Sequence, residues 1–251
     1  MIHEGEGTTE RFANKVVMIT GGASGMGKEM AFMFQAEGAT VIAADVSEQR
    51  LNDLSKEGID ARYVDVSNEE HWRQLADDVY QKYQRIDVLV NNAGISSEKT
   101  IEEIEAADWE TMMNINGFGA FAGMKHVVPY MKEHQEGAVV NISSYTAQVG
   151  MGLNVYTASK GAVRAISRAA SVQYGPSGIR VNAVFPGVIE TPMTKGLQES
   201  QETLQRLVGA TPLGRLGKPR EVGQAVLFLA SEEASFITGA ELVIDGGFTS
   251  Q

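Results

Sequence analysis

The stretch "VVMITGGASGMGKEMAFMF" (residues 16–34) joins a short apolar run to a helical pattern through a glycine-rich turn. The run "VVMIT" (16–20) has the continuous apolar content of a buried strand. Gly21, Gly25 and Gly27 follow it with the spacing G-x-x-x-G-x-G. Such a turn lets the backbone approach a pyrophosphate closely and aims the amino end of the next helix at its negative charge. We therefore predict a dinucleotide-binding turn here.

An acidic residue ends the next apolar run, "TVIAAD" (40–45), 18 residues after Gly27. A carboxylate at this place can accept hydrogen bonds from the ribose hydroxyls of NAD, and it would repel the 2′-phosphate of NADP. The alternative is that Asp45 only begins a loop or caps the helix expected from residue 47. Since no basic residue follows the turn before Lys28, the sequence predicts NAD as the cofactor.

Short apolar runs alternate with longer helical patterns along the rest of the chain. The expected strands are 16–20, 40–45, 62–66, 86–91, 138–143, 180–185 and 241–246. The expected helices are 25–37, 47–57, 68–84, 109–134, 156–174 and 220–230. This alternation indicates an α/β protein with a doubly wound Rossmann fold, about seven parallel strands and helices on both faces. The alternative, a TIM barrel, would need an eighth strand–helix unit.

Neither a repeat nor a Pro/Gly/Ser linker divides the chain, so we expect a single domain over residues 13–251. Residues 1–12 are expected to form a flexible N-terminal tail. This opening segment has neither the basic start nor the apolar run of a signal peptide, which favours a cytoplasmic location. No segment approaches 18 apolar residues, and membrane spans are therefore not expected.

The overall charge and the rare residue types restrict the function further. A formal net charge of −11 argues against nucleic acid or anionic lipid as a partner. The absence of cysteine excludes disulfides and thiolate catalysis. The four histidines have no close metal-ligand spacing, so we expect no metal site.

The stretch "VYTASKGAV" (155–163) places a tyrosine four residues before a lysine. On a helix Tyr156 and Lys160 would share one face. Free tyrosine has a pKa of about 10 and is a poor base at neutral pH. A nearby ammonium, helped by the charge of a cofactor, lowers that pKa. Tyr156 could then exchange a proton with a substrate oxygen while hydride moves to or from nicotinamide.

Seven motifs occur together in one order along the chain. They are "TGGASGMG" (20–27), "NNAG" (91–94), "NING" (114–117), "NISS" (141–144), "YTASK" (156–160), "PGVIETP" (186–192) and "DGG" (245–247). In order and spacing they resemble the short-chain dehydrogenase/reductase family over nearly the whole chain. The ending "GGFTSQ" is similar to that of bacterial secondary-alcohol dehydrogenases in this family.

The resemblance implies four catalytic residues, Asn116, Ser144, Tyr156 and Lys160. Counting from Asn141 selects Ser144, whereas counting back from Tyr156 selects Ser143. We choose Ser144 because strand register fixes side-chain direction more firmly than loop length does. Asn116 matches the asparagine that holds a proton-relay water, with Asn114 as the less favoured neighbour. The alternative for Asn116 is a helix-interior amide bonded to the backbone.

The resemblance also implies a cofactor site, a lid and an assembly. The cofactor residues would be Gly21, Ser24, Gly25, Met26, Gly27 and Asp45, then Asp65 and Val66 beside adenine, Asn92, Ala93 and Gly94 at the centre of the cofactor, and Tyr156, Lys160, Gly187, Ile189 and Thr191 around the nicotinamide and its ribose. The substrate lid would span about 190–217. Members are usually homotetramers, with 109–134 and 156–174 as the expected interface.

The expected activity is NAD-dependent interconversion of a secondary alcohol and a ketone, with a small molecule as the substrate. One alternative is a 3-oxoacyl-thioester reductase that acts on an acyl-carrier protein and often uses NADP. A further alternative is a non-catalytic NAD-binding regulator.

Overall fold

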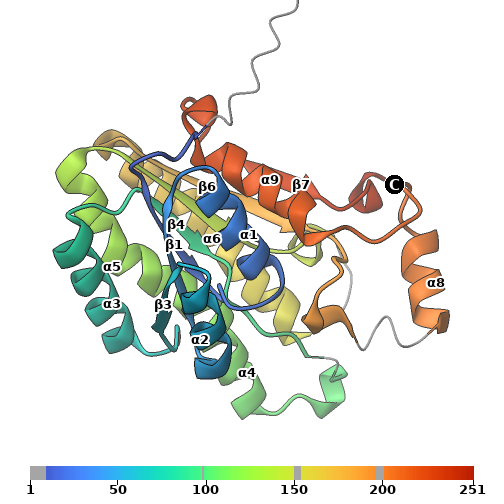
Figure 1. The fold of residues 1–251 in the computed structure, drawn as a ribbon. Helices are drawn as coiled ribbons and strands as arrows, with labels where there is room; N and C mark the ends of the chain where they lie inside the picture. Colours follow the sequence, from blue (N-terminus) through green and yellow to red (C-terminus); the bar gives the residue numbers. More distant parts are fainter. Residues whose placement is uncertain (1–9, 98, 150–153, 196–200) are drawn as a thin grey trace, which may run out of the picture.

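The computed structural model describes residues 10–97, 99–149, 154–195 and 201–251. Seven strands form one parallel sheet in the order β3-β2-β1-β4-β5-β6-β7 (Figure 1). The strands are β1 (Val16–Thr20), β2 (Thr40–Asp45), β3 (Asp60–Tyr63), β4 (Val88–Asn91), β5 (Gly137–Ile142), β6 (Ile179–Pro186) and β7 (Glu241–Ile244). The expected doubly wound fold is therefore confirmed. β1 and β2 have the predicted boundaries, the other boundaries shift by no more than two residues, and only β3 differs further, ending three residues before the predicted 66.

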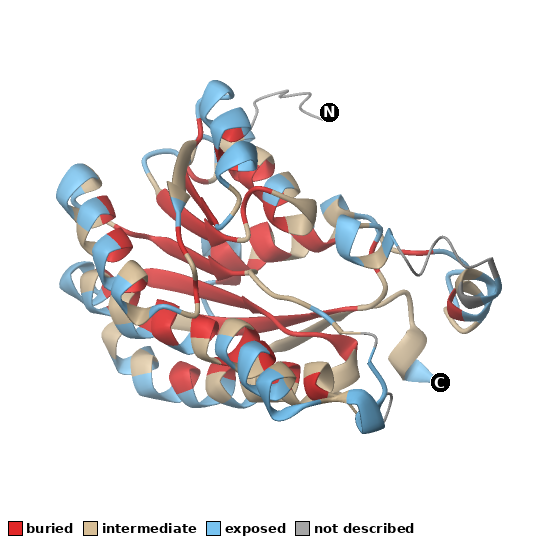
Figure 2. Cartoon of the chain, turned by 90° about the horizontal axis from the view of Figure 1, so that it is seen from below, coloured by how far each residue is buried: buried red, intermediate tan, exposed pale blue. Residues whose placement is uncertain are grey.

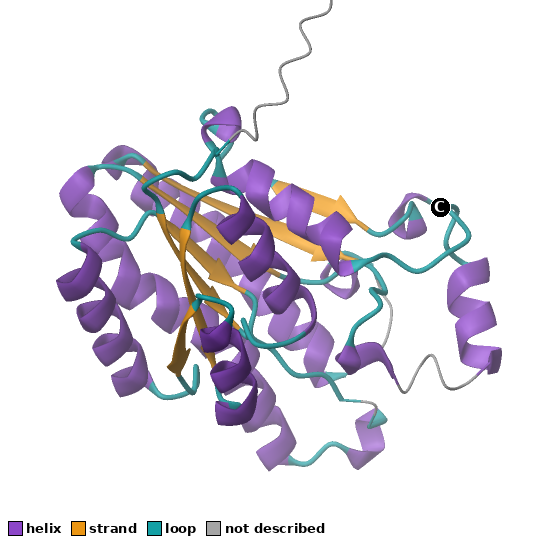
Figure 3. Cartoon of the chain, in the orientation of Figure 1, coloured by secondary structure: helices purple, strands orange, loops and turns teal. Residues whose placement is uncertain are grey.

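Helices cover both faces of the sheet (Figure 3). Alternate residues of β1 separate the two layers: Val17 and Ile19 pack with one set of helices, and Val16 and Met18 with the other. The first set is α1 (Gly25–Ala36), α2 (Glu48–Lys56) and α9 (Pro219–Ala230), and the second is α3 (Glu69–Tyr83), α5 (Gly119–His134) and α6 (Val155–Tyr174). The inner strands β1, β4, β5 and β6 are almost wholly buried and apolar because helices cover both faces, as the buried layers in Figure 2 show, whereas the edge strands β3 and β7 are partly exposed.

The single helix expected at 109–134 is three segments. α4 (Ala106–Met112) passes into a π-helical turn (Met113–Phe118), and α5 follows. At the junction the Gly119 amide donates to the Asn114 carbonyl, five residues back instead of four. Such a turn holds one residue more than an α-helical turn. It carries Asn116 and leaves that side chain buried.

Shorter helical segments connect the main elements. They are α8 (Gln201–Gly209) and the 3-10 turns Ile101–Glu103, Tyr145–Ala147, Gly175–Ser177, Pro192–Thr194, Glu232–Ala234 and Phe248–Ser250. The predicted lid thus contains a 3-10 turn and α8, which lies at the margin of the molecule in Figure 1. Residues 196–200 of the lid lie outside the described residues.

The expected flexible tail, 1–12, is too long at its inner end. Phe12 is only 2% exposed and packs edge-on against Phe34. Arg11 forms an ion pair with Glu37. These two residues belong to the folded domain, because an aromatic side chain and an ion pair attach them to α1 and to the residue after it. Residues 1–9 lie outside the part of the chain that the structure describes.

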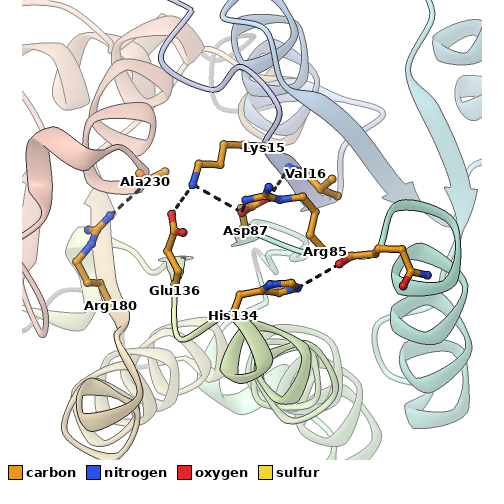
Figure 4. A network of polar contacts seen from close by, with 9 residues as sticks. Lys15, Val16, Arg85, Asp87, His134, Glu136, Arg180 and Ala230 are labelled. Carbon is orange, nitrogen blue, oxygen red and sulfur yellow. Dashed lines mark hydrogen bonds and ion pairs between the residues drawn. The ribbon is translucent and has the colours of Figure 1, made fainter.

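Hydrogen bonds and ion pairs of charged side chains connect the amino ends of the central strands (Figure 4). An Asp87 carboxylate oxygen accepts from the Val16 amide at 2.7 Å and another pairs with Arg85. Lys15 pairs with both Asp87 and Glu136. A cavity of about 400 Å³ lies at this edge, where Lys15 pairs with Asp87 and Glu136 and Arg180 donates to backbone carbonyls. We therefore place the functional site at the opposite edge, where the strands have their carboxyl ends.

Candidate active site

The glycine-rich turn lies between the carboxyl end of β1 and the start of α1. Gly21 has a φ of +61°, a conformation that side chains other than glycine rarely adopt. A Cβ on Gly27 would lie 2.1 Å from the Gly21 carbonyl oxygen. Only glycine permits this contact, which lets the helix start directly against the turn.

The loop after β4 holds this turn in place. The Asn92 side-chain amide donates to the Thr20 carbonyl at 2.9 Å. The Thr20 hydroxyl oxygen accepts from the backbone amides of Asn92 and Ala93, each at 3.0 Å. Gly21 and the Asn92–Gly94 loop, two separate predicted parts of the cofactor site, are therefore adjacent.

The amino end of α1 fits an anion. The Ser24 side chain makes no capping hydrogen bond, and the first helical turn contains no acidic residue. The first amides of a helix and its dipole attract negative charge. The backbone at Gly25, Met26 and Gly27 is thus suited to a pyrophosphate.

Asp45 lies beside the turn and is 9% exposed. One carboxylate oxygen accepts from the Ala23 amide and the other from the Ser47 amide, both at 3.1 Å. Asp45 therefore organises the turn and the start of α2, as the structural alternative expected. A carboxylate has about four acceptor positions, so ribose hydroxyls can bind to the remaining two.

Asp65 and Val66 follow β3 at the same edge of the sheet. The Asp65 carboxylate accepts from the Ser67 amide at 2.9 Å and from the Ser67 hydroxyl at 2.6 Å. The Val66 carbonyl accepts from the Trp72 indole at 3.1 Å. These bonds fix the loop where the resemblance places adenine.

Tyr156 and Lys160 lie in the first turns of α6. The Asn154 side chain caps this helix by accepting from the Thr157 amide at 3.0 Å. The Lys160 ammonium nitrogen is 5.8 Å from the centre of the Tyr156 ring and donates to the Ile142 carbonyl at 2.9 Å. The helix and the end of β5 therefore hold the pair together.

The two candidate serines have different partners. The Ser143 hydroxyl donates to the Lys160 carbonyl at 2.9 Å. The Ser144 hydroxyl lies close enough to the Tyr156 phenol to act on its pKa, and its oxygen accepts from the Thr146 hydroxyl at 3.0 Å. The structure brings Ser144 together with Tyr156 and attaches Ser143 to the helix backbone.

Asn116 is buried between α6 and the loop after β4. Its amide donates to the Ile95 carbonyl and the Ser159 hydroxyl, both at 2.9 Å, and its oxygen accepts from the Ile95 amide at 2.8 Å. A Cβ on Gly94 would lie 3.1 Å from this oxygen and 3.3 Å from the Lys160 ammonium. Asn116 and Lys160 thus flank Gly94, whereas Asn114 is exposed.

Burial shifts both members of the proton-transfer pair toward their neutral forms. It lowers the pKa of Lys160 from 10.5 to about 8. Burial also raises the pKa of the Tyr156 phenol, and the hydrogen bond from Ser144 acts in the opposite direction. The expected lowering of the tyrosine pKa combines the ammonium with the charge of a bound cofactor; in the protein alone, desolvation has the largest effect on this pKa.

A cavity of about 90 Å³ opens onto these side chains. It is lined by Met26, Asn92, Gly94, Ile142, Ser143, Ser144, Tyr156, Lys160, Pro186, Gly187, Ile189, Thr191, Met193 and Thr194. Ile142, Pro186 and Thr194 were not predicted as site residues. Ile142 and Pro186 both fall within quoted motifs, but no sequence signal distinguishes the Ile142 carbonyl, which only the fold brings to Lys160.

A neighbouring cavity, of about 380 Å³, shares Gly187 and Ile189 with the cavity that contains Tyr156. Its other walls come from the end of the lid and from the C-terminal segment, including Asp245. The side chain of the C-terminal residue, Gln251, donates to the Ala210 carbonyl at 2.6 Å. The C-terminal end of the chain therefore lies against the lid.

Two further features concern only the residues that the structure describes. Among them, no helix has both the length and the apolar character needed to cross a membrane. Within the same ranges, no three His, Asp or Glu side chains are arranged to hold a metal ion.

Comparison with known proteins adds to this geometry. A family model described as "Enoyl-(Acyl carrier protein) reductase" matches residues 21–249. Cyclopentanol dehydrogenase from a Comamonas species is 42% identical over 247 residues, which cover 96% of this chain and 99% of that protein.

A further relative and a solved structure are also similar to this chain over nearly its whole length. The 3-oxoacyl-[acyl-carrier-protein] reductase FabG of Thermotoga maritima is 43% identical and aligns with 94% of this chain and 98% of its own. The solved structure of Thermoplasma acidophilum aldohexose dehydrogenase is 34% identical, with a TM-score of 0.89 over 98% of this chain and 97% of that one.

Proposed function

We propose, because the chain belongs to the short-chain dehydrogenase/reductase family, that it is an NAD-dependent oxidoreductase that interconverts a secondary alcohol and a ketone. The observation that carries this proposal is the grouping of Ser144, Tyr156 and Lys160, with Lys160 one helical turn from Tyr156. All three side chains line the same cavity.

Members of this family use NAD or NADP. When bound, the oxidised cofactor supplies a hydride acceptor and a positive charge. The turn at Gly21–Gly27 would hold its pyrophosphate, and Lys160 would hold the nicotinamide ribose. Ile189, Thr191 and the backbone at Gly187 border the cavity at the nicotinamide end.

Ser144 would bind the substrate oxygen and orient it toward Tyr156. Tyr156 would take the hydroxyl proton in the oxidation and return it to the carbonyl oxygen in the reduction. Burial raises the tyrosine pKa, so the phenolate requires nearby positive charge during the proton transfer. Asn116, which flanks Gly94 with Lys160, is assigned the relay role that the resemblance implies.

Asp45 supports NAD over NADP. Its carboxylate is buried beside the glycine-rich turn, and no basic residue follows that turn before Lys28. A 2′-phosphate near Asp45 would meet negative charge.

A small, moderately apolar alcohol suits the catalytic cavity. Ile189, Met193 and Pro186 supply apolar surface there, and the similar cyclopentanol dehydrogenase acts by name on such an alcohol. The similar FabG protein supports the other activity, reduction of a 3-oxoacyl thioester on an acyl-carrier protein. A non-catalytic NAD-binding regulator would show neither activity.

Initial rates on two substrate classes test the proposal. Cyclopentanol and acyclic secondary alcohols are measured with NAD and NADP, and acetoacetyl thioester with NADH and NADPH. We expect alcohol oxidation with NAD, and at least a 100-fold loss of turnover in Tyr156→Phe with NADH binding retained. Thioester reduction favoured by NADPH would support the alternative, and full activity of Tyr156→Phe would contradict the mechanism.

We further propose a cytoplasmic homotetramer without nucleic-acid or membrane partners. The net charge of −11 is unsuited to polyanionic surfaces. Trp109, Phe121 and Val172 are exposed apolar side chains on α4, α5 and α6. α5 and α6 cover the same face of the sheet and α4 contacts α6, so contacts with other copies there would bury the three side chains together.

A further inference from the structure

We propose that Arg164, oriented by Glu241, positions the turn that carries Ser144 against the helix that carries Tyr156 and Lys160. Arg164 lies in α6, one turn beyond Lys160, and Glu241 is the first residue of β7. The inference rests on the proposed function, because it concerns the alignment of the proposed catalytic residues.

Arg164 uses its guanidinium in two directions. Nε and one terminal nitrogen contact the two Glu241 carboxylate oxygens, each at 2.8 Å. The other terminal nitrogen donates to the Ala147 carbonyl at 3.1 Å. A planar guanidinium can make these contacts together, whereas a lysine ammonium lacks the paired geometry.

Ala147 ends the 3-10 turn that begins at Ser144. The Ala147 amide donates to the Ser144 carbonyl at 3.0 Å, and the Thr146 amide donates to the Ser144 hydroxyl oxygen at 3.3 Å. Because these bonds make one compact turn, holding the Ala147 carbonyl restricts where Ser144 can lie.

Glu241 strengthens this arrangement from the edge of the sheet. Its side chain is 18% exposed and also accepts from the Gln148 amide at 3.3 Å. The hydrogen bonds from Arg164 hold the pKa of Glu241 below its usual value. The carboxylate therefore stays charged at neutral pH and fixes both Arg164 and the residue that follows the turn.

The segment from Ser143 to Ala147 is thus attached to α6 at two points. The Ser143 hydroxyl is bonded to the Lys160 carbonyl, and the Ala147 carbonyl to Arg164. Neither Arg164 nor Glu241 lines the catalytic cavity. Arg164 is a positioning residue, since it acts on the reaction only through Ser144 and its turn.

A double-mutant cycle separates this role from general stabilisation. We compare Arg164→Met with wild type, and Arg164→Met/Ser144→Ala with Ser144→Ala, by kcat and KM at saturating cofactor. Arg164→Met should lower kcat by about 10- to 100-fold in the wild-type background and far less once Ser144 is absent. Equal losses in the two backgrounds would overturn the proposal.

Three further variants sharpen the test. Glu241→Gln keeps the size of the side chain but removes the charge that pairs with Arg164, and it should lose part of the activity. Arg164→Lys keeps a positive charge without the paired nitrogens, and its activity should be close to that of Arg164→Met. Arg168→Met is the matched control, because Arg168 lies one turn further along α6, is 67% exposed and only approaches Glu241, at 3.7 Å. An effect of Arg168→Met as large as that of Arg164→Met would count against the proposal.

Amide hydrogen exchange tests the contact without using activity. Arg164→Met should accelerate exchange at Thr146, Ala147 and Gln148 while leaving the β5 amides protected. Unchanged exchange at the turn would overturn the proposal whatever the substrate is. If the wild-type protein oxidises no alcohol and accelerated exchange is still found, the proposed function fails and the positioning of the turn stands.

Discussion

At the scale of single residues, Ser143 and Ser144 show how neighbouring hydroxyls receive different roles. Ser144→Ala removes the hydroxyl that lines the cavity beside Tyr156 and should lower kcat by about 100-fold, with dinucleotide affinity unchanged. Ser143→Ala removes only a bond to the helix backbone and should have a smaller effect on kcat. Steady-state kinetics and NADH titration of both variants check this, and a larger loss for Ser143→Ala would reverse the assignment.

Lys160 makes the stability of the protein depend on pH in a defined range. Its folded pKa of about 8 lies below the ordinary 10.5, so between these values the unfolded chain binds the extra proton. The free energy of unfolding should therefore rise with pH, by about 2–3 kcal/mol from pH 8 to 10. Well below pH 8 this contribution is constant, because Lys160 is then protonated in both states.

Urea unfolding of wild type and Lys160→Met at pH 7, 8, 9 and 10 measures this effect. The rise should be missing from the variant. The range stops at pH 10 because the raised pKa of Tyr156 acts with the opposite sign above that value, where the unfolded chain loses its phenol proton first. Parallel pH profiles for the two proteins would contradict a depressed Lys160 pKa.

At the scale of elements, the contact between the glycine-rich turn and α1 permits a matched pair of substitutions. Gly27→Ala would place a methyl group on the Gly21 carbonyl, and should cost roughly 1–3 kcal/mol of stability and weaken NADH binding. Gly161→Ala, inside α6 with no atom within 4 Å of the added methyl, should gain about 0.5–1 kcal/mol.

Urea unfolding and NADH fluorescence titration compare the two variants. A Gly27→Ala protein that binds NADH as tightly as wild type would show that the turn tolerates displacement from α1. Destabilisation by Gly161→Ala would show an unrecognised constraint on α6.

The π-helical turn marks a limit of prediction from the sequence. The apolar pattern over 109–134 predicted one helix, since an inserted residue changes the hydrogen-bond pattern without a distinctive composition. The turn differs from an α-helix only in which carbonyl accepts the hydrogen bond from the Gly119 amide. This difference depends on how the buried Asn116 packs. The glycine-rich turn was predictable because backbone geometry there demands glycine itself.

At the scale of the whole molecule, the alternation of apolar runs and helical patterns predicted a doubly wound sheet of about seven parallel strands, and the structure supplies their order. The site is less predictable. Motifs located Tyr156, Lys160 and the serine pair, but the direction of the tyrosine pKa shift depends on burial, which no local pattern specifies. The roles of the Ile142 carbonyl and of Arg164 come from contacts between distant segments, so only the folded chain shows them.

The proposed tetramer should depend on the exposed apolar side chains of α5 and α6. Sedimentation equilibrium should give about four times the chain mass of 27.1 kDa. The double variant Phe121→Glu/Val172→Glu changes side chains that are 49% and 78% exposed in the single chain. It should assemble into fewer than four subunits, because the interface would have to bury two carboxylates. Tyr63→Glu, at a residue 53% exposed on the far strand β3, is the control. A tetramer in the double variant would place the interface elsewhere.

The strand order also has a consequence for synthesis on the ribosome. In the order β3-β2-β1-β4-β5-β6-β7, every strand after β1 pairs with a strand that has already been translated: β2 and β4 with β1, and each later strand with its predecessor on that side. No strand therefore has to wait for a partner that is still to be made. Since unpaired strand edges in nascent chains promote aggregation, the sheet can grow outward from β1 while the chain emerges.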